Sequence, residues 1–135
     1  MVTLSPNRKD SRGFTLIELM VVISIMLILI SIAAPQYAQS VLRARETVLR
    51  NNLFTLRSSI TQYTLDKQRA PQALDELVSA GYLREIPRDP IANTREWEII
   101  MEDAYMTMDQ TQPGIWDVKS TSTGTSTEGT PYNAW

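Results

Sequence analysis

Residues 14–34 read FTLIELMVVISIMLILISIAA, and this stretch decides the fold. Glu18 is its only charged residue. At about 1.5 Å of rise per residue, a helix of this length spans roughly 30 Å, the thickness of the hydrocarbon core of a bilayer. A helix is the one local structure that satisfies its own backbone in lipid. We therefore expect residues 14–34 to cross a membrane as a helix.

The residues before this stretch set its orientation. Residues 1–13, MVTLSPNRKDSRG, are polar, and they carry Arg8, Lys9 and Arg12 just before the apolar run. A basic flank stays on the cytoplasmic side of a membrane. The sequence thus predicts a single pass with a short cytoplasmic N-terminus and everything after Ala34 on the outer side.

Two ordinary readings of such a segment leave Glu18 unexplained. The first is a permanent signal anchor. The second is a cleaved secretory signal peptide, for which Ala38-Gln39-Ser40 offers a small-residue cleavage site. A carboxylate at the centre of a bilayer costs about 2.5–3.5 kcal/mol, and near the end of a span the cost is smaller. The position of Glu18, five residues into the apolar run, still requires a reason.

The sequence RGFTLIE, residues 12–18, resembles the processing and methylation motif of type IV pilins and type II secretion pseudopilins. The resemblance implies that a membrane-embedded prepilin peptidase cuts between Gly13 and Phe14, and that the new N-terminal Phe14 is N-methylated. Glu18 is then the fifth residue of the mature chain. The resemblance also implies its role, which is to meet the N-terminal amine of a neighbouring subunit in a growing filament.

Beyond the span the pattern changes to an amphipathic one. Pro35 lies where many pilins carry a proline, and because it cannot donate to the Ser31 carbonyl we expect it to kink or locally melt the helix. Apolar residues then recur at steps of three and four, which predicts a helix over 36–67 that ends before Pro71. The predicted apolar face holds Val41, Ala44, Val48, Leu49, Leu53, Leu56, Ile60 and Tyr63. The predicted polar face holds Arg43, Arg45, Glu46, Arg50, Asn51, Asn52 and Arg57.

The connecting segment, residues 70–90, combines a short helix with an extended stretch. Residues 71–83 predict the helix, with Gly81 as its C-terminal stop, and the prolines of 84–90 favour extended chain. This segment resembles the connecting loop of the major, G-type pseudopilins. Short alternating runs at 97–101 and 114–119 predict an antiparallel sheet, and 102–108 is either a third strand or a loop.

The C-terminal tail is rich in serine and threonine over residues 120–130 and ends in Pro131-Tyr132-Asn133-Ala134-Trp135. A polar tract of this kind is flexible by itself. Two aromatic residues at its end indicate docking, so we expect Tyr132 and Trp135 to pin the loop to the domain.

In G-type pseudopilins the equivalent loop holds a calcium ion. The resemblance therefore implies a possible calcium loop around Asp117, Ser122 and Glu128. Calcium takes six to eight oxygen ligands and usually several carboxylates, whereas Glu128 is the only charged residue of the serine and threonine tract at 120–130. We expect no bound metal and no other cofactor.

Composition narrows the function further. The 135-residue chain has no cysteine and no histidine, so disulfides, thiol nucleophiles, imidazole bases and His/Cys zinc sites are excluded. A formal net charge of −2 without a concentrated basic face argues against nucleic-acid binding. The sequence shows no pair of acidic residues and no activated nucleophile that would indicate an enzyme.

The sequence thus predicts an α+β, pilin-like fold in which a long helix packs by its second half on a small antiparallel sheet. The resemblance implies a structural subunit of a type II secretion pseudopilus, located in the bacterial inner membrane before assembly and in a periplasmic or cell-surface filament afterwards. The implied partners are further copies of the chain, prepilin peptidase, an inner-membrane assembly platform and minor pseudopilins. A type IV pilus pilin and an anchored periplasmic binding module that does not polymerise are the alternatives; many type IV pilins carry a C-terminal disulfide, which this chain cannot form. The expected division is a leader (1–13), a transmembrane or filament-core helix (14–35) and a periplasmic domain (36–135), whose sheet and C-terminal loop occupy 91–135.

Overall fold

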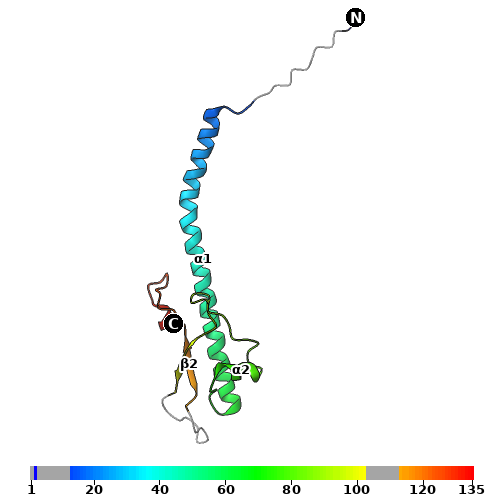
Figure 1. Ribbon diagram of the computed structural model, residues 1–135, viewed down its shortest axis with the longest axis vertical. Coiled ribbons are helices and arrows are strands. Elements are labelled where there is room, and N and C mark those ends of the chain that lie inside the picture. The colour runs from blue at the N-terminus through cyan, green and yellow to red at the C-terminus, as the bar shows by residue number, and fades with distance from the viewer. Residues whose placement is uncertain (1, 3–12, 103–112) are drawn as a thin grey trace. The chain divides into compact units, whose positions relative to one another are not determined.

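The computed structural model describes residue 2, residues 13–102 and residues 113–135. The chain forms two units, Met1–Ala38 and Gln39–Trp135. Its elements in chain order are α1 (Leu16–Lys67), α2 (Leu74–Ser79), β1 (Glu98–Met101), β2 (Ile115–Lys119) and the 3-10 helix η1 (Tyr132–Ala134) (Figure 1).

The first unit contains the apolar half of α1. Every residue from 14 to 34 is exposed, and this helix is long and apolar enough to cross a membrane. The hydroxyls of Ser24 and Ser31 donate to the carbonyl oxygens of Met20 (2.8 Å) and Ile28 (2.7 Å) one turn earlier. These two hydroxyls of the span are therefore satisfied by the helix itself, which suits an apolar surrounding.

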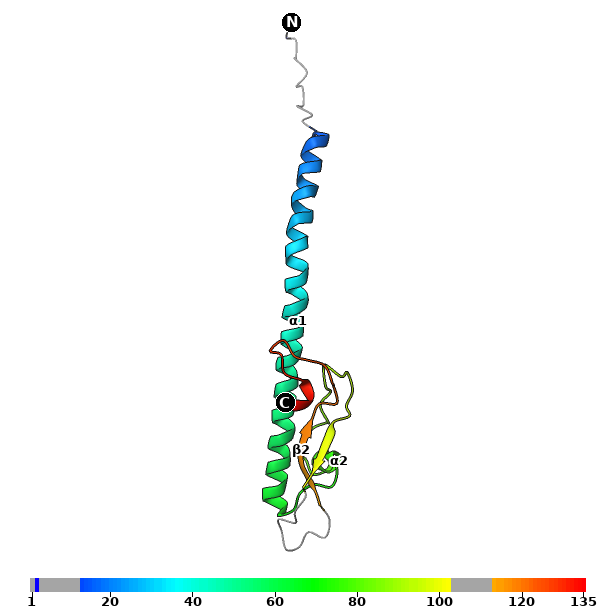
Figure 2. The same cartoon turned by 90° about the vertical axis from the view of Figure 1, so that its left-hand side faces the viewer.

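The second unit packs the other half of α1 against the sheet. Figure 2 shows β1 and β2 lying alongside this half of the helix, and α2 lies next to them. One hydrophobic core joins α1, α2 and β2. Its buried members are Leu49, Leu53, Leu56, Ile60 and Tyr63 from α1, Leu74 and Leu77 from α2, and Trp97, Ile115, Val118 and Tyr132 from the rest of the unit. The α+β fold predicted from the sequence is confirmed.

The buried stripe of α1 differs from the predicted one in its first two turns. It begins at Glu46 and continues through Leu49 and Leu53, whereas Ala44 is exposed and Val48 is 49 % exposed. The predicted apolar face was therefore wrong at Ala44 and Val48. Steps of three and four from Leu49 lead back to Glu46, and Val48 falls off this line because it is adjacent to Leu49.

The short helix α2 covers a smaller range than the 71–83 predicted. It ends at Ser79, and Gly81 follows with a φ of +85°. In this left-handed conformation the chain reverses, so that the N–H groups of Tyr82 and Leu83 both donate to the Leu77 carbonyl (2.9 and 3.1 Å). Glycine adopts this conformation at no steric cost, which explains why the helix stops here.

The sheet has two antiparallel strands, and its register is irregular at one point. Ile99 pairs with Val118 and Ile100 with Asp117, but Met101 pairs with Ile115, so Trp116 has no opposite residue. Trp116 is 63 % exposed. A β-bulge of this kind redirects a side chain and bends the strand. The possible third strand at 102–108 lies outside the described residues except at Glu102.

The proline-rich segment before the sheet is tied down by a buried acid. Asp89 is fully buried, and its Oδ1 accepts hydrogen bonds from the N–H groups of Ile91 (2.8 Å) and Ala92 (3.0 Å). Its second oxygen accepts a short hydrogen bond from the Ser120 hydroxyl, just after β2. The indole N–H of Trp97 donates to the Pro87 carbonyl (3.0 Å). The connecting segment is thus fixed to both strands' ends.

Adjacent positions on α1 test the packing directly. Leu53 is 2 % exposed in the core and Phe54 is 71 % exposed. Leu53→Ala should lower the free energy of unfolding of the domain by about 2–5 kcal/mol, because it removes buried methyl groups and leaves a cavity. Phe54→Ala should change it by only about 0.5 kcal/mol. Denaturant titration of the purified chain, followed by tryptophan fluorescence, measures both; equal losses would contradict this packing.

Candidate functional site

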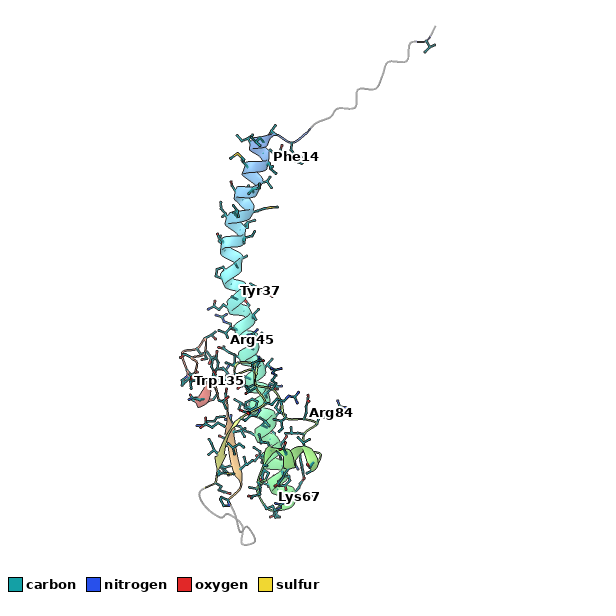
Figure 3. The ribbon with its side chains drawn as sticks, viewed as in Figure 1. Phe14, Tyr37, Arg45, Lys67, Arg84 and Trp135 are labelled. Atoms are coloured by element: carbon teal, nitrogen blue, oxygen red, sulfur yellow. The ribbon has the colours of Figure 1, made fainter. Side chains whose placement is uncertain are left out.

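The predicted processing site lies at the start of α1. Phe14 is 86 % exposed and precedes the first turn (Figure 3). An added Cβ at Gly13 would meet no atom within 4 Å, and the Gly13 backbone is not left-handed. The described fold therefore gives no reason for glycine at this position. The basic residues Arg8, Lys9 and Arg12 lie outside the described residues.

Glu18 occupies the first turn of α1 and carries the only charge of the span. Its backbone N–H donates to the hydroxyl of Thr15 (3.2 Å), which caps the helix start. Among the residues that the structure describes, none makes a hydrogen bond or ion pair to the Glu18 carboxylate. This carboxylate therefore lies exposed on an apolar helix with no partner from the described part of its own chain.

Pro35 lies within α1, and the helix continues through it to Lys67. The expected local melting at Pro35 therefore does not occur, because the remaining backbone hydrogen bonds hold the helix on both sides. The missing donor to the Ser31 carbonyl is a fixed consequence of proline. A bend at this position stays a prediction.

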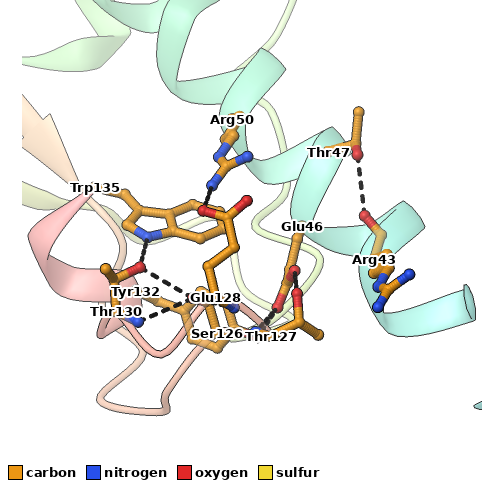
Figure 4. Close-up of polar contacts among 10 residues, drawn as sticks. All are labelled: Arg43, Glu46, Thr47, Arg50, Ser126, Thr127, Glu128, Thr130, Tyr132 and Trp135. Atoms are coloured by element: carbon orange, nitrogen blue, oxygen red, sulfur yellow. Dashed lines mark hydrogen bonds and ion pairs between the residues drawn. The ribbon is translucent and has the colours of Figure 1, made fainter. Parts of the chain in front are cut away.

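A second site joins the C-terminal segment to α1. We call it the tail clamp and define it as Glu46, Arg50 and Arg57 of α1 with the residues of 117–135 that they contact. Glu46 is 5 % exposed, although its sequence neighbours Arg45 and Thr47 are exposed. Its carboxylate accepts three hydrogen bonds (Figure 4). The donors are the Thr127 N–H (2.8 Å), the Thr127 hydroxyl (2.5 Å) and the Tyr132 hydroxyl (2.8 Å).

Arg50 forms the next level of the tail clamp, one turn along α1. Its Nη2 lies 2.6 Å from Oε2 of Glu128, and its guanidinium carbon lies 4.2 Å from the centre of the Trp135 ring. The Trp135 indole N–H donates in turn to the Thr130 hydroxyl (2.8 Å). Because Arg50 and Glu128 are both about half exposed, their ion pair contributes little by itself and mainly orients Trp135.

Arg57 forms the third level, two turns beyond Arg50. Its Nε donates to Oδ1 of Asp117 (2.6 Å), and its Nη2 donates to the carbonyl oxygens of Val118 (3.1 Å) and Trp135 (2.8 Å). One guanidinium therefore bonds both the strand β2 and the last residue of the chain. The expectation that Tyr132 and Trp135 pin the tail is confirmed: Tyr132 is 3 % exposed, and the two rings meet edge to face at 5.3 Å.

Electrostatics at Glu46 favours its ionised form. Burial opposes the charge, but the hydrogen bonds from Thr127 and Tyr132, with the positive charge of Arg50, outweigh it and hold the pKa of Glu46 below its ordinary value. Burial and the hydrogen bond to Glu46 raise the pKa of Tyr132 to about 12. Glu46 therefore adds to the free energy of unfolding at pH values above the ordinary pKa of a carboxyl group. This contribution is lost as the pH falls through the lower pKa that Glu46 has in the folded state.

The three residues named for a possible calcium loop are not brought together. Asp117 pairs with Arg57 and Glu128 pairs with Arg50, seven positions apart on α1. The Ser122 hydroxyl oxygen lies 3.4 Å from the N–H of Gly124, within its own loop. Within residues 13–102 and 113–135, no three acidic side chains are grouped as metal ligands would be. The donor set found here does not fit a calcium ion.

Glu46 is the site residue that the sequence pattern placed wrongly. The pattern predicts Glu46 on the polar face, together with Arg43, Arg45 and Arg50, but Glu46 is buried. A signal was present: Glu46, Leu49, Leu53, Leu56, Ile60 and Tyr63 follow one another at alternating steps of three and four. A glutamate on a buried stripe requires hydrogen-bond donors, and the hydroxyl-rich tail was the available source.

Comparisons with known proteins agree with this picture. A family model described as the prokaryotic N-terminal methylation motif matches residues 8–34. The type II secretion system core protein G of Klebsiella michiganensis is 34 % identical over 100 residues, which cover 62 % of this chain and 70 % of that protein. The protein of the same name from Pseudomonas aeruginosa is 31 % identical over 107 residues, covering 67 % and 75 %. That from Escherichia coli is 32 % identical over 98 residues, covering 61 % and 68 %.

A comparison with solved structures gave no significant match. The sequence relatives are decisive by themselves, since the matches at 34 % and 31 % identity include 70 % and 75 % of those two proteins. The chain therefore belongs to the family of the type II secretion system core protein G, a family of pseudopilins.

Proposed function

We propose that this chain is a structural subunit of a type II secretion pseudopilus, which polymerises through its N-terminal helix to drive protein export. The observation that carries the proposal is the exposed apolar stretch from Phe14 to Ala34, which leads into and includes the first turns of α1, in a chain of the core protein G family. Burying one Leu or Ile side chain contributes about 1.5–3 kcal/mol. A helix with this many exposed apolar side chains is stable only in a membrane or against other apolar helices.

Before assembly the subunit is anchored in the inner membrane by this helix. The topology we propose follows from the basic flank at Arg8, Lys9 and Arg12, which keeps the N-terminus cytoplasmic and leaves the second unit in the periplasm. The partner in this state is prepilin peptidase, for which Gly13-Phe14 is the proposed cleavage site. Cleavage removes the basic leader and creates a new amine on Phe14, which is then methylated.

The new amine supplies the charge that Glu18 lacks. At a separation of about 4 Å and an effective dielectric near 20, a carboxylate and an ammonium attract by on the order of 4 kcal/mol. We propose that Glu18 of each arriving subunit binds the Phe14 amine of a neighbour, which fixes the axial register of the two helices. A charge that is costly in lipid then favours the move from the membrane into the filament.

Packing of the apolar helices completes the assembly. Helices in lipid gain little hydrophobic energy from pairing, so close packing and the Glu18 pair have to supply the driving force. Contacts from one end of a subunit to the other end of the next do not close into a ring and give a helical homopolymer. An inner-membrane assembly platform and minor pseudopilins are the further partners that we propose. The role is mechanical, and we propose no catalytic activity for it.

The processing proposal predicts the mature N-terminus. Mass spectrometry of the chain extracted from membranes should show the loss of residues 1–13 and one added methyl group on Phe14. Replacing Gly13 with leucine should leave the full-length precursor in the membrane, because the peptidase site is blocked while the fold has room for a side chain at this position. A mature chain that starts at Val41 would contradict the proposal and indicate ordinary secretion.

The assembly proposal predicts a selective effect of Glu18→Gln. Removing the charge from lipid should leave membrane insertion and trimming intact. Filament yield should fall sharply, because the amide cannot pair with the Phe14 amine. Glu18→Asp should act in the same direction but less severely, since it keeps the charge and shortens its reach.

Two amounts decide this test: trimmed subunit in the membrane fraction, and filament sheared from the cells or imaged. Glu85→Gln is the matched control, because it makes the same chemical change at an exposed ion pair with Arg95 in the second unit. The control should give the wild-type amount of filament. A normal filament yield from Glu18→Gln, with normal trimming, would rule out the ion-pair mechanism.

A further inference from the structure

We infer that Glu46 holds the C-terminal loop, residues 120–131, in its place on α1, so that this loop requires no calcium ion. The inference concerns the stability of the second unit and does not depend on the proposed function. It rests on three observations: the direction of the hydrogen bonds at Glu46, the pairing of the loop's acidic neighbours, and the closure of the loop by its own hydroxyls.

The groups that face Glu46 are all hydrogen-bond donors. The Thr127 N–H, the Thr127 hydroxyl and the Tyr132 hydroxyl each point a hydrogen at one carboxylate on α1. A calcium ion requires the opposite arrangement, with oxygen lone pairs directed at its centre. A loop that points donors at a carboxylate suits an anion, and Glu46 supplies that anion from the helix.

The acids near the loop are already neutralised by arginines. The Arg50–Glu128 and Arg57–Asp117 contacts are both 2.6 Å long. Binding calcium through Asp117 or Glu128 would separate these pairs. The same arginines also hold Trp135 and the carbonyl oxygens of Val118 and Trp135, so their positions are fixed by further contacts of the tail clamp.

The turn at the tip of the loop satisfies its own polar groups. The Ser126 hydroxyl oxygen accepts hydrogen bonds from the N–H groups of Glu128 and Thr130 (3.2 Å each) and lies 3.0 Å from the Thr130 hydroxyl. The Ser126 and Thr130 backbones are joined by a 2.7 Å bond, and Gly129 turns the chain with a φ of +84°. The hydroxyl that could ligate a cation is therefore used inside the turn.

Because Glu46 is buried, its contacts should contribute more to the stability of the tail clamp than the exposed ion pair of Arg50 and Glu128 does. At 5 % exposure its carboxylate has little access to water, so its three hydrogen bonds are not replaced by solvent when they are lost. Arg50 and Glu128 are each about half exposed, and water can replace their pair. The variants Glu46→Gln and Glu128→Gln make the same chemical change at these two contrasting positions.

The test compares chelation with substitution in the full, trimmed chain in detergent. Thermal unfolding is followed by the fluorescence of its tryptophans, which lie in the second unit. Wild-type chain should have the same Tm with excess EGTA and with millimolar CaCl2. A calcium site filled to about a hundred times its Kd would raise Tm by more than about 10 °C. Such a rise would overturn the inference.

Glu46→Gln should lower Tm by about 10 °C in both buffers, because a charged acceptor of three hydrogen bonds is lost. Glu128→Gln should lower it by no more than about 2 °C. A wild-type Tm for Glu46→Gln would overturn the inference. A calcium response in the wild type that disappears in Glu46→Gln would make Glu46 a calcium ligand, and this outcome would overturn it also.

Milder variants cover the case in which Glu46→Gln does not accumulate. Thr127→Val and Tyr132→Phe each remove one hydroxyl donor and keep the carboxylate, and each should lower Tm by a smaller amount that EGTA does not change. Hydrogen exchange gives a local readout: the Thr127 amide should lose protection in Tyr132→Phe, while the amides of Leu53 and Leu56 keep theirs. Unchanged protection at Thr127, with an unchanged Tm, would contradict the role of Glu46.

Discussion

The apolar half of α1 imposes the constraint on which the rest of the molecule depends. Every residue from 14 to 34 is exposed, and the described parts of the chain leave this surface uncovered. Water disfavours such a surface, so its cover has to come from lipid or from other helices. Glu18 adds a second requirement, because a carboxylate in an apolar surrounding needs a positive partner. Lipid satisfies the first requirement and not the second, whereas the proposed bundle of trimmed copies, with free Phe14 amines, would satisfy both. This difference gives a physical reason for a subunit to leave a membrane in which its helix is otherwise stable.

The second half of the same helix meets a different requirement. From Glu46 to Tyr63 one stripe is buried against α2, the sheet and the C-terminal tail. The sheet has only two strands among the described residues, and its core is correspondingly small. The tail clamp adds polar contacts at three levels of the helix, at Glu46, Arg50 and Arg57. These contacts join residues that lie 60 to 86 positions apart in the sequence, so they fix the end of the chain to its middle without a disulfide.

The sequence predicts those elements that are determined by residues close to one another in the chain. The apolar run, the end of α1 at Lys67, the stop at Gly81 and the two strands each follow from residues next to one another. Glu46 could not be placed in the same way, because its burial is decided by Thr127 and Tyr132 at the far end of the chain. Val48 was placed wrongly for a related reason: two adjacent apolar residues, Val48 and Leu49, compete for one stripe, and the position of the tail and sheet decides between them. The bulge that exposes Trp116 likewise depends on strand register, which no single strand encodes.

We propose that other copies of the chain cover the apolar half of α1. Electron microscopy of cells that overproduce the chain with its assembly machinery tests this packing. We expect thin filaments that react with an antibody to the chain, and a density map of them should show residues 14–34 packed together along the central axis. Correctly trimmed subunits that stay dispersed in the inner membrane, or filaments whose centre lacks these helices, would contradict it.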